Sequence, residues 1–147
     1  MFQKINQNPN LPKAIICDID GTIANIWNRS PYDLTKVLED KPHWDMINLL
    51  TQLSPNYKLI FVSGRSDECR NETEKWLATN FWMRIEDIIL FMRKESDKRK
   101  DTIVKYEILE KITRIFRIDY IFDDRDQVVQ MAREAWFRVL QVANWSF

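Results

Sequence analysis

Short apolar runs alternate along the chain with longer stretches in which apolar residues recur at helical spacing. The short runs predict strands over 14–17, 58–62, 88–91, 120–122 and 137–142. The periodic stretches predict helices over 43–53, 67–80, 100–116 and 126–135. Strands separated by helices favour right-handed crossovers and a parallel sheet that is buried on both faces. We therefore expect an α/β, Rossmann-like fold, in which helices cover both faces of a parallel five-stranded sheet.

The chain of 147 residues is predicted to hold one domain, over 13–147, preceded by a polar leader over 1–12. Residues 23–42 are irregular, contain Pro31 and Pro42, and could hold a small hairpin. Neither the stretch after the first motif nor the stretch between the third strand and the lysine is long enough to hold a large cap domain over the site. We expect a capless or minimally capped site, and an open site suits a macromolecular end better than a small metabolite.

Composition and charge exclude few functional classes. The 22 basic and 22 acidic residues cancel, so no global charge argues for a nucleic-acid or membrane partner. Two cysteines make neither a disulfide framework nor a zinc site. Without a signal peptide or an apolar run of about 20 residues, we expect a cytoplasmic protein of a bacterial or phage-infected cell, with no membrane partner.

Polar signatures follow three of the predicted strands. Asp18 and Asp20 come after the first strand, Ser63 after the second, and Asp123 and Asp124 after the fourth. Ligands of such sheets bind beyond the carboxyl ends of the strands, so these side chains are expected to converge there.

Four carboxylates at one place repel one another unless a cation neutralises them, and Mg²⁺ prefers carboxylate, water and phosphate oxygens. We predict Asp18 and Asp123 as direct ligands of Mg²⁺, with the backbone carbonyl of Asp20 as a third. Asp124 is predicted to bind the ion through water or to orient a ligand.

A metal beside a second carboxylate suits phosphoryl transfer. Asp18 is the predicted nucleophile, which would form an aspartyl-phosphate, and Asp20 the predicted general acid and base. Ser63 would donate a hydrogen bond to the phosphate. A lysine should balance the charge, and Lys105 and Lys98 are the candidates.

The chain contains only two glycines, and both lie in these motifs. Gly21 closes Asp18-Ile-Asp-Gly-Thr22, and Gly64 follows Ser63. Glycine allows a positive φ and a close backbone approach to a ligand, so we expect the backbone to approach a phosphate at both positions.

The four motifs together resemble the haloacid dehalogenase-like (HAD) phosphatase superfamily, whose members carry DxDGT, a Ser or Thr, a Lys and an acidic pair in this order. The resemblance covers nearly the whole chain from Lys13. The chain looks most similar to the 3′-phosphatase domain of phage polynucleotide kinase/phosphatase. The segments that carry this similarity are Lys13–Ala24, Pro31–Asp33, Val62–Arg65, Asp97–Lys105, Asp123–Val129 and Gln141–Asn144.

This resemblance implies a Mg²⁺-dependent enzyme that removes the 3′-phosphate from DNA or RNA ends. It implies that Lys105, not Lys98, fills the lysine role, and that Arg125 lies beside the metal. It also implies structural or binding roles for Arg93 and Asp101. The expected phosphate-binding residues are Thr22, Ser63, Gly64, Arg65 and Arg93.

Alternatives remain. The chain lacks a GxxxxGK[ST] motif, so no kinase domain is expected in it. A small-molecule phosphatase of the nucleotidase type and a binding module without turnover are the other candidate functions. The basic run over 93–100 could bind a nucleic-acid backbone or form a solvated loop, and Trp27 could stack on a base.

Overall fold

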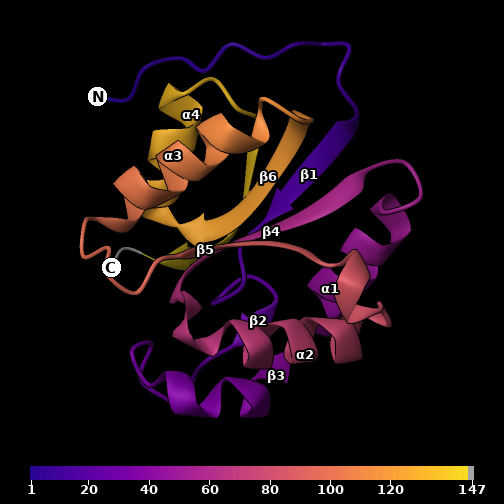
Figure 1. Ribbon diagram of the computed structural model, residues 1–147, viewed down its shortest axis with the longest axis vertical. Helices are drawn as coiled ribbons and strands as arrows, with labels where there is room; N and C mark the ends of the chain where they lie inside the picture. Colours follow the sequence, from indigo (N-terminus) through magenta and orange to yellow (C-terminus); the bar gives the residue numbers. More distant parts are fainter. Residues whose placement is uncertain (146–147) are drawn as a thin grey trace.

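One parallel sheet forms the centre of the protein, which is described here by a computed structural model covering residues 1–145. Residues 146–147, the end of the predicted domain over 13–147, lie outside the described part. The strands follow the order β5 (Ile89–Arg93), β4 (Lys58–Ser66), β1 (Lys13–Cys17), β6 (Arg117–Arg125), β7 (Val139–Trp145), as Figure 1 shows. All neighbouring strands pair in parallel, so the predicted α/β fold with a five-stranded parallel sheet is confirmed.

Helices cover both faces of this sheet. They are α1 (Trp44–Leu53) and α2 (Arg70–Phe81) on one face, and α3 (Asp101–Ile112) and α4 (Asp126–Glu134) on the other (Figure 1). Ala14 and Ile16 of β1 belong to the core under α3 and α4, while Ile15 belongs to the core under α1 and α2. Alternate strand residues point to opposite faces, which explains why the apolar run of β1 is unbroken. None of these helices is long and apolar enough to cross a membrane.

Two strands extend further than the apolar runs predict. Both β4 and β6 continue through the polar motifs, because Ser63 still pairs with Met92 of β5 and Asp123 with Gln141 of β7. Backbone pairing is indifferent to side-chain polarity, so the motif residues are held inside the ends of strands. Two short 3₁₀ turns, η2 (Asp67–Cys69) and η3 (Ile85–Asp87), precede α2 and β5.

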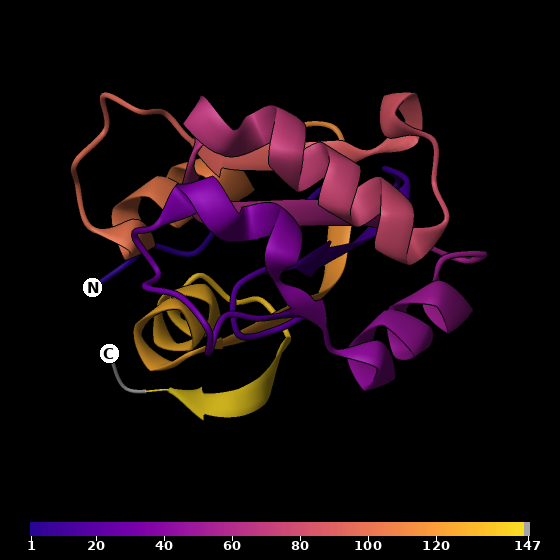
Figure 2. The same cartoon turned by 90° about the horizontal axis from the view of Figure 1, so that it is seen from below.

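A small insertion separates β1 from α1. It contains β2 (Ala24–Asn25), η1 (Leu34–Glu39) and β3 (Lys41–Pro42). The sequence allowed a small hairpin here, and β2 and β3 do pair antiparallel, but a long segment that contains η1 joins them. The indole N–H of Trp76 in α2 donates to the carbonyl of Asp40 at 2.8 Å, which ties the insertion to the helix layer. Figure 2 shows the insertion, in purple, beside α2. This segment is a minimal cap.

The predicted leader over 1–12 runs past α4 on its way to β1 (Figure 1). The backbone N–H of Phe2 donates to Glu134 at 2.9 Å, and the Phe2 ring lies 5.1 Å from that of Tyr106. The leader therefore packs against α3 and α4.

The core under α1 and α2 should respond strongly to truncation. Leu77→Ala removes a side chain with 0% exposure, so we expect the free energy of unfolding to fall by about 2–5 kcal/mol. Leu49→Ala, on the exposed side of α1, should cost less than about 1 kcal/mol. Urea unfolding followed by circular dichroism measures both, and equal losses would contradict the assignment of Leu77 to the core.

Candidate active site

The pairing of β1 with β6 brings the first carboxylates together. Cys17 pairs with Phe122, and the backbone N–H of Asp18 donates to the carbonyl of Phe122 at 3.0 Å. Asp18 therefore lies beside Asp123. One carboxylate oxygen each of Asp18, Asp123 and Asp124 lies within 4.8 Å of the others, and all three residues are buried.

A buried lysine from the neighbouring helix enters this cluster. The Nζ of Lys105 lies 2.8 Å from Oδ1 of Asp18 and 2.9 Å from Oδ2 of Asp123. Burial opposes its charge, but Asp123, Asp18 and Asp101 outweigh burial and raise the pKa of Lys105 well above the ordinary value. Lys105, and not Lys98, is therefore the lysine that contacts the predicted nucleophile.

The ammonium of Lys105 does not balance the negative charge of the three carboxylates. Burial is the main cause that raises the pKa of Asp18 above its ordinary value, with Asp123 and Asp124 adding to it and Lys105 opposing it. Burial, followed by repulsion from Asp123, raises the pKa of Asp124 to about 6. Three clustered carboxylates facing one ammonium form a donor set that fits a hard divalent cation, because such an ion supplies the missing positive charge.

Two arginines hold Asp20 apart from this cluster. Arg65 bonds Asp20 through Nε at 3.1 Å and through Nη2, and Arg29 reaches Oδ1 of Asp20 at 3.1 Å. Both arginines also bond Asp40, at 2.7 Å from Arg29 and 2.8 Å from Arg65. The side chains of the arginines and Asp40 are almost fully buried, while that of Asp20 keeps 23% exposure. Asp20 is thus rigidly oriented and still reaches solvent.

Sequence reasoning did not identify Arg29 or Asp40. Both belong to the irregular insertion, where no periodicity or motif marks them. Asp40 bonds both Arg29 and Arg65, and Arg65 comes from β4, so only the folded chain brings the three together. The predicted contact of Arg65 with the substrate phosphate stays a prediction, because its bonds in this structure go to Asp20, Asp40 and Thr73.

Gly21 has the backbone conformation that its sequence position suggested, with φ +84°. A Cβ at this position would overlap the carboxylate of Asp124. The glycine therefore lets the carboxylate of Asp124 come close to the backbone turn. The predicted approach of the backbone to a phosphate stays a prediction.

Gly64 also makes room for a carboxylate. Its φ is not positive, and a Cβ here would overlap Asp101. Arg93 donates through Nε to the carbonyl of Gly64 at 3.0 Å and through Nη2 to Asp101 at 3.1 Å. Arg125 approaches the other oxygen of Asp101 at 3.2 Å. Arg93 thus joins β4 to α3 in this structure, and its predicted phosphate contact stays a prediction.

Thr22 and Ser63 are buried at the edges of the cluster. The hydroxyl of Thr22 donates to Oδ2 of Asp18 at 3.2 Å and lies 3.4 Å from Asp124. The hydroxyl of Ser63 accepts from the backbone N–H of Arg65 at 3.1 Å, and Ser63 has 0% exposure. Their predicted bonds to phosphate remain predictions.

The basic run over 93–100 divides into two groups. Arg99 forms ion pairs with Asp97 and Glu107 at 2.7 Å each, so its charge is compensated locally. The lysines of the run are exposed: Lys94, Lys98 and Lys100. The loop is therefore partly a solvated ion-pair network and partly a set of exposed cations.

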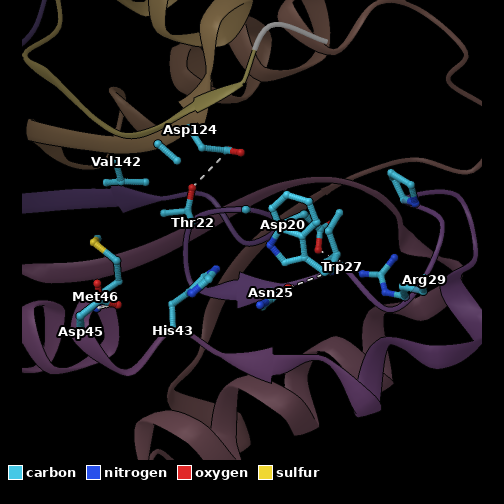
Figure 3. A pocket seen from close by; sticks show the side chains of 14 residues that line it. Asp20, Thr22, Asn25, Trp27, Arg29, His43, Asp45, Met46, Asp124 and Val142 are labelled. Atoms are coloured by element: carbon cyan, nitrogen blue, oxygen red, sulfur yellow. Dashed lines mark hydrogen bonds and ion pairs between the residues drawn. The ribbon is translucent and has the colours of Figure 1, made fainter.

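Two cavities open onto the carboxylates, and Asp20 and Asp124 line both. One, of about 540 Å³, is lined mainly by charged residues, among them Lys98, Arg125 and Lys105. The other, of about 550 Å³, is shown in Figure 3; its lining is mostly apolar and also includes Asn25, Arg29 and His43.

Comparisons with known proteins agree with this geometry. Residues 12–147 match the family described as the polynucleotide kinase PNKP phosphatase domain. A relative from Autographa californica nuclear polyhedrosis virus, whose name describes a bifunctional polynucleotide kinase/RNA ligase, is 36% identical over 124 residues. That match covers 82% of this chain and 18% of the relative, so the chain spans less than a fifth of the relative's length.

Solved structures with similar folds include a chain from a protein complex and a phosphatase. A chain from the Pnkp1/Rnl/Hen1 complex is 35% identical, with a TM-score of 0.87 over 100% of this chain and 51% of that chain. A class C acid phosphatase from Bacillus anthracis, solved with tungstate bound, shares the fold, with a TM-score of 0.64 at 17% identity. It covers 91% of this chain and 68% of that chain.

Without metal, removal of one carboxylate should stabilise the protein. Because the pKa of Asp124 is raised to about 6, its contribution to stability is present at low pH and is lost as the pH rises through that value. In EDTA at pH 7.5 we expect Asp124→Asn to raise Tm by about 2–4 °C, the effect of about 1 kcal/mol in a domain of this size. The difference should vanish near pH 4.

Calorimetry at both pH values tests this. Asp87→Asn, at an exposed carboxylate of η3, is the control and should change the free energy of unfolding by less than about 0.5 kcal/mol. Added Mg²⁺ should stabilise the wild type more than Asp124→Asn, because the ion binds only the folded state. Equal Tm values of wild type and variant in EDTA at pH 7.5 would contradict the repulsion between Asp123 and Asp124.

Proposed function

The chain belongs to the family of the polynucleotide kinase PNKP phosphatase domain and is a HAD phosphatase, and from this premise we propose that it removes the 3′-phosphate from nucleic-acid ends with Mg²⁺ as its cofactor. The observation that carries the proposal is the pair of carboxylates two residues apart in different surroundings. Asp18 lies in a buried cluster with Lys105, and Asp20 is held at the solvent edge by two arginines.

Asp18 is the nucleophile of this proposal. Its carboxylate attacks phosphorus and the bond to the leaving 3′-oxygen breaks, which gives an aspartyl-phosphate on Asp18. Lys105 and Thr22 contact different oxygens of Asp18 and hold it in one orientation. Lys105 also offers a positive charge to the phosphate oxygens.

Asp18, Asp123 and Asp124 would hold Mg²⁺, and the backbone carbonyl of Asp20 is the further ligand that the sequence predicts. The bound ion would neutralise the carboxylates and the charge on the phosphate. Supporting evidence is the raised pKa of Asp18 and of Asp124, which marks a site short of positive charge.

Asp20 is the proposed general acid and base. Asp20 acts in its protonated form and donates that proton to the leaving 3′-oxygen; the carboxylate that results accepts a proton from the water that hydrolyses the aspartyl-phosphate, which restores the acid. The bonds from Arg29 and Arg65 fix the direction of its carboxylate, so both arginines are positioning residues. We propose this role for Arg65 in place of direct phosphate contact.

Phosphate binding is assigned to the charged cavity. Gly64, Lys98, Lys105 and Arg125 line this cavity beside Asp18. Arg93 supports it by holding Asp101 and the carbonyl of Gly64. Ser63 and Thr22 support it by orienting backbone and carboxylate, respectively.

A solved structure that contains a similar chain is described as the Pnkp1/Rnl/Hen1 RNA repair complex. One relative's name joins a polynucleotide kinase to an RNA ligase, and another belongs to a complex named for Pnkp1, Rnl and Hen1. We propose that this chain likewise prepares ends for ligation. A nucleotidase that acts on mononucleotides is the second candidate, favoured by an apolar cavity of about 550 Å³, which lies within the range for small-molecule sites.

A comparison of substrates tests the function. Phosphate release is measured from 3′-phosphorylated RNA and DNA oligonucleotides, from nucleoside monophosphates and from p-nitrophenyl phosphate, each with Mg²⁺ and with EDTA. We expect the oligonucleotides to have the highest kcat/KM, and EDTA to abolish release. Asp18→Asn should lower kcat by at least about 10⁴-fold, because it removes the nucleophile. Faster turnover of mononucleotides than of oligonucleotides would favour the nucleotidase instead.

Arg29→Lys tests the positioning of Asp20. A lysine cannot bond Asp20 and Asp40 in the planar fork of a guanidinium, so we expect kcat for a 3′-phosphorylated oligonucleotide to fall about 10- to 100-fold, with KM changed less than about threefold. The loss should be smaller for p-nitrophenyl phosphate, whose leaving group needs no proton.

The control for Arg29→Lys is Arg84→Lys, since Arg84 forms an exposed ion pair with Asp87. Kinetics of this control should match the wild type. An equal loss on both leaving groups in Arg29→Lys would contradict a role that acts through the general acid.

A further inference from the structure

A second cavity, with a mostly apolar lining, adjoins the charged cavity and shares Asp20 and Asp124 with it. We call it the Trp27 cavity. Asp20, Thr22 and Asp124 belong to its lining. Its apolar lining residues include Trp27, Met46 and Val142, and its further polar residues include Arg29. Its volume of about 550 Å³ lies in the range of sites for small ligands or their parts. A group that is joined to a phosphate at Asp18 can therefore extend into it.

Trp27 is the most prominent side chain of this cavity. It keeps 71% exposure, although it lies at the entrance to a buried catalytic centre. Its backbone N–H donates to Oδ1 of Asn25 at 2.9 Å, which holds the turn that follows β2. In Figure 3 Trp27 lies across the view from Met46 and Val142. These two side chains and the indole offer apolar surfaces to a flat ring.

Polar groups are also available around the cavity. His43, which precedes α1, and Asp45 in its first turn both line it, together with Asn25. The side chain of His43 makes no capping bond to the helix. Imidazole, carboxylate and amide groups match the donors and acceptors on the edge of a nucleobase. An apolar lining with a few polar groups is typical of a site for a heteroaromatic ring.

The charged cavity is poorly suited to the same ring. Its lining includes Arg93, Asp101, Lys105 and Arg125, which would have to lose hydration or exchange partners against an apolar face. The two cavities share Asp20 and Asp124, so one nucleotide can place its phosphate in the charged cavity and its base in the Trp27 cavity.

We propose that the Trp27 cavity binds the nucleobase of the 3′-terminal nucleotide, which stacks on the indole of Trp27. This inference rests on the proposed function and adds to it a subsite that recognises a base without strong sequence preference, because every base offers a π face. The enzyme should then discriminate between ends with and without a terminal base.

The test compares two 3′-phosphorylated oligonucleotides that are identical except that one lacks its terminal base. For the wild type we expect kcat/KM to be about 5- to 150-fold higher with the base present, the range for stacking of one base. Trp27→Ala should reduce this ratio to about one, and Trp27→Phe should restore most of it. Equal rates of the wild type on both substrates, or an unchanged preference in Trp27→Ala, would overturn the proposal.

Trp82→Ala is the matched control. Trp82 keeps 91% exposure at the C-terminus of α2 and lines neither cavity, so the wild-type rates and base preference should persist. Thermal unfolding of each variant identifies any loss of fold.

A failure of the proposed 3′-phosphatase function can be told apart from a failure of the base subsite. If neither oligonucleotide is a substrate while p-nitrophenyl phosphate is hydrolysed, the same ratio is measured with a nucleoside 3′-monophosphate and the corresponding baseless sugar phosphate. A Trp27-dependent preference there supports the base subsite in a nucleotidase. Its absence overturns the subsite.

Discussion

The repulsion among Asp18, Asp123 and Asp124 is the constraint on which the site depends. Parallel pairing of β1 and β6 places these carboxylates together, and the fold then has to compensate for their charge in a buried setting. Lys105 supplies part of the compensation from α3. The deficit that remains is what makes the cluster suited to a divalent cation, since a site neutralised by the protein alone would bind a cation weakly.

A second electrostatic unit lies next to the first and is balanced internally. Arg29, Arg65, Asp20 and Asp40 carry two positive and two negative charges, and three of the four side chains are almost fully buried. The bonds among these four side chains offset the cost of burying their charges. The bonds to Asp20 also fix the orientation of its carboxylate. The two carboxylates of the first motif are therefore separated in chemistry although they are two residues apart: one belongs to a charge-deficient cluster and the other to a neutral network.

Both glycines serve this dense packing of charge. Gly21 leaves space for the carboxylate of Asp124, and Gly64 leaves space for that of Asp101. The expectation that the backbone approaches a phosphate at both glycines stays a prediction. The groups that the structure shows against them are carboxylates of the protein. At Gly64 the benefit is that Asp101 reaches the position from which it pairs with Lys105, Arg93 and Arg125.

The sequence alone determined the order of strands and helices, and the motif residues at the strand ends, because apolar runs and their spacing are local properties of the chain. It also singled out Lys105 through family resemblance, and the structure places that residue against Asp18. Strand ends were less predictable: β4 and β6 run through polar residues because pairing with β5 and β7 continues there.

Only the tertiary structure decided which partners each charged group has. Arg29 and Asp40 lie in an irregular segment without periodicity. Asp40 joins Arg29, which is 11 residues away, to Arg65, which is 25 residues away. The same holds for the two cavities, since their walls combine the insertion with α1 and β7 on one side and with the 93–101 loop on the other. Ion pairs and cavities depend on distances in space, and residues far apart in sequence carry no local signal of their proximity.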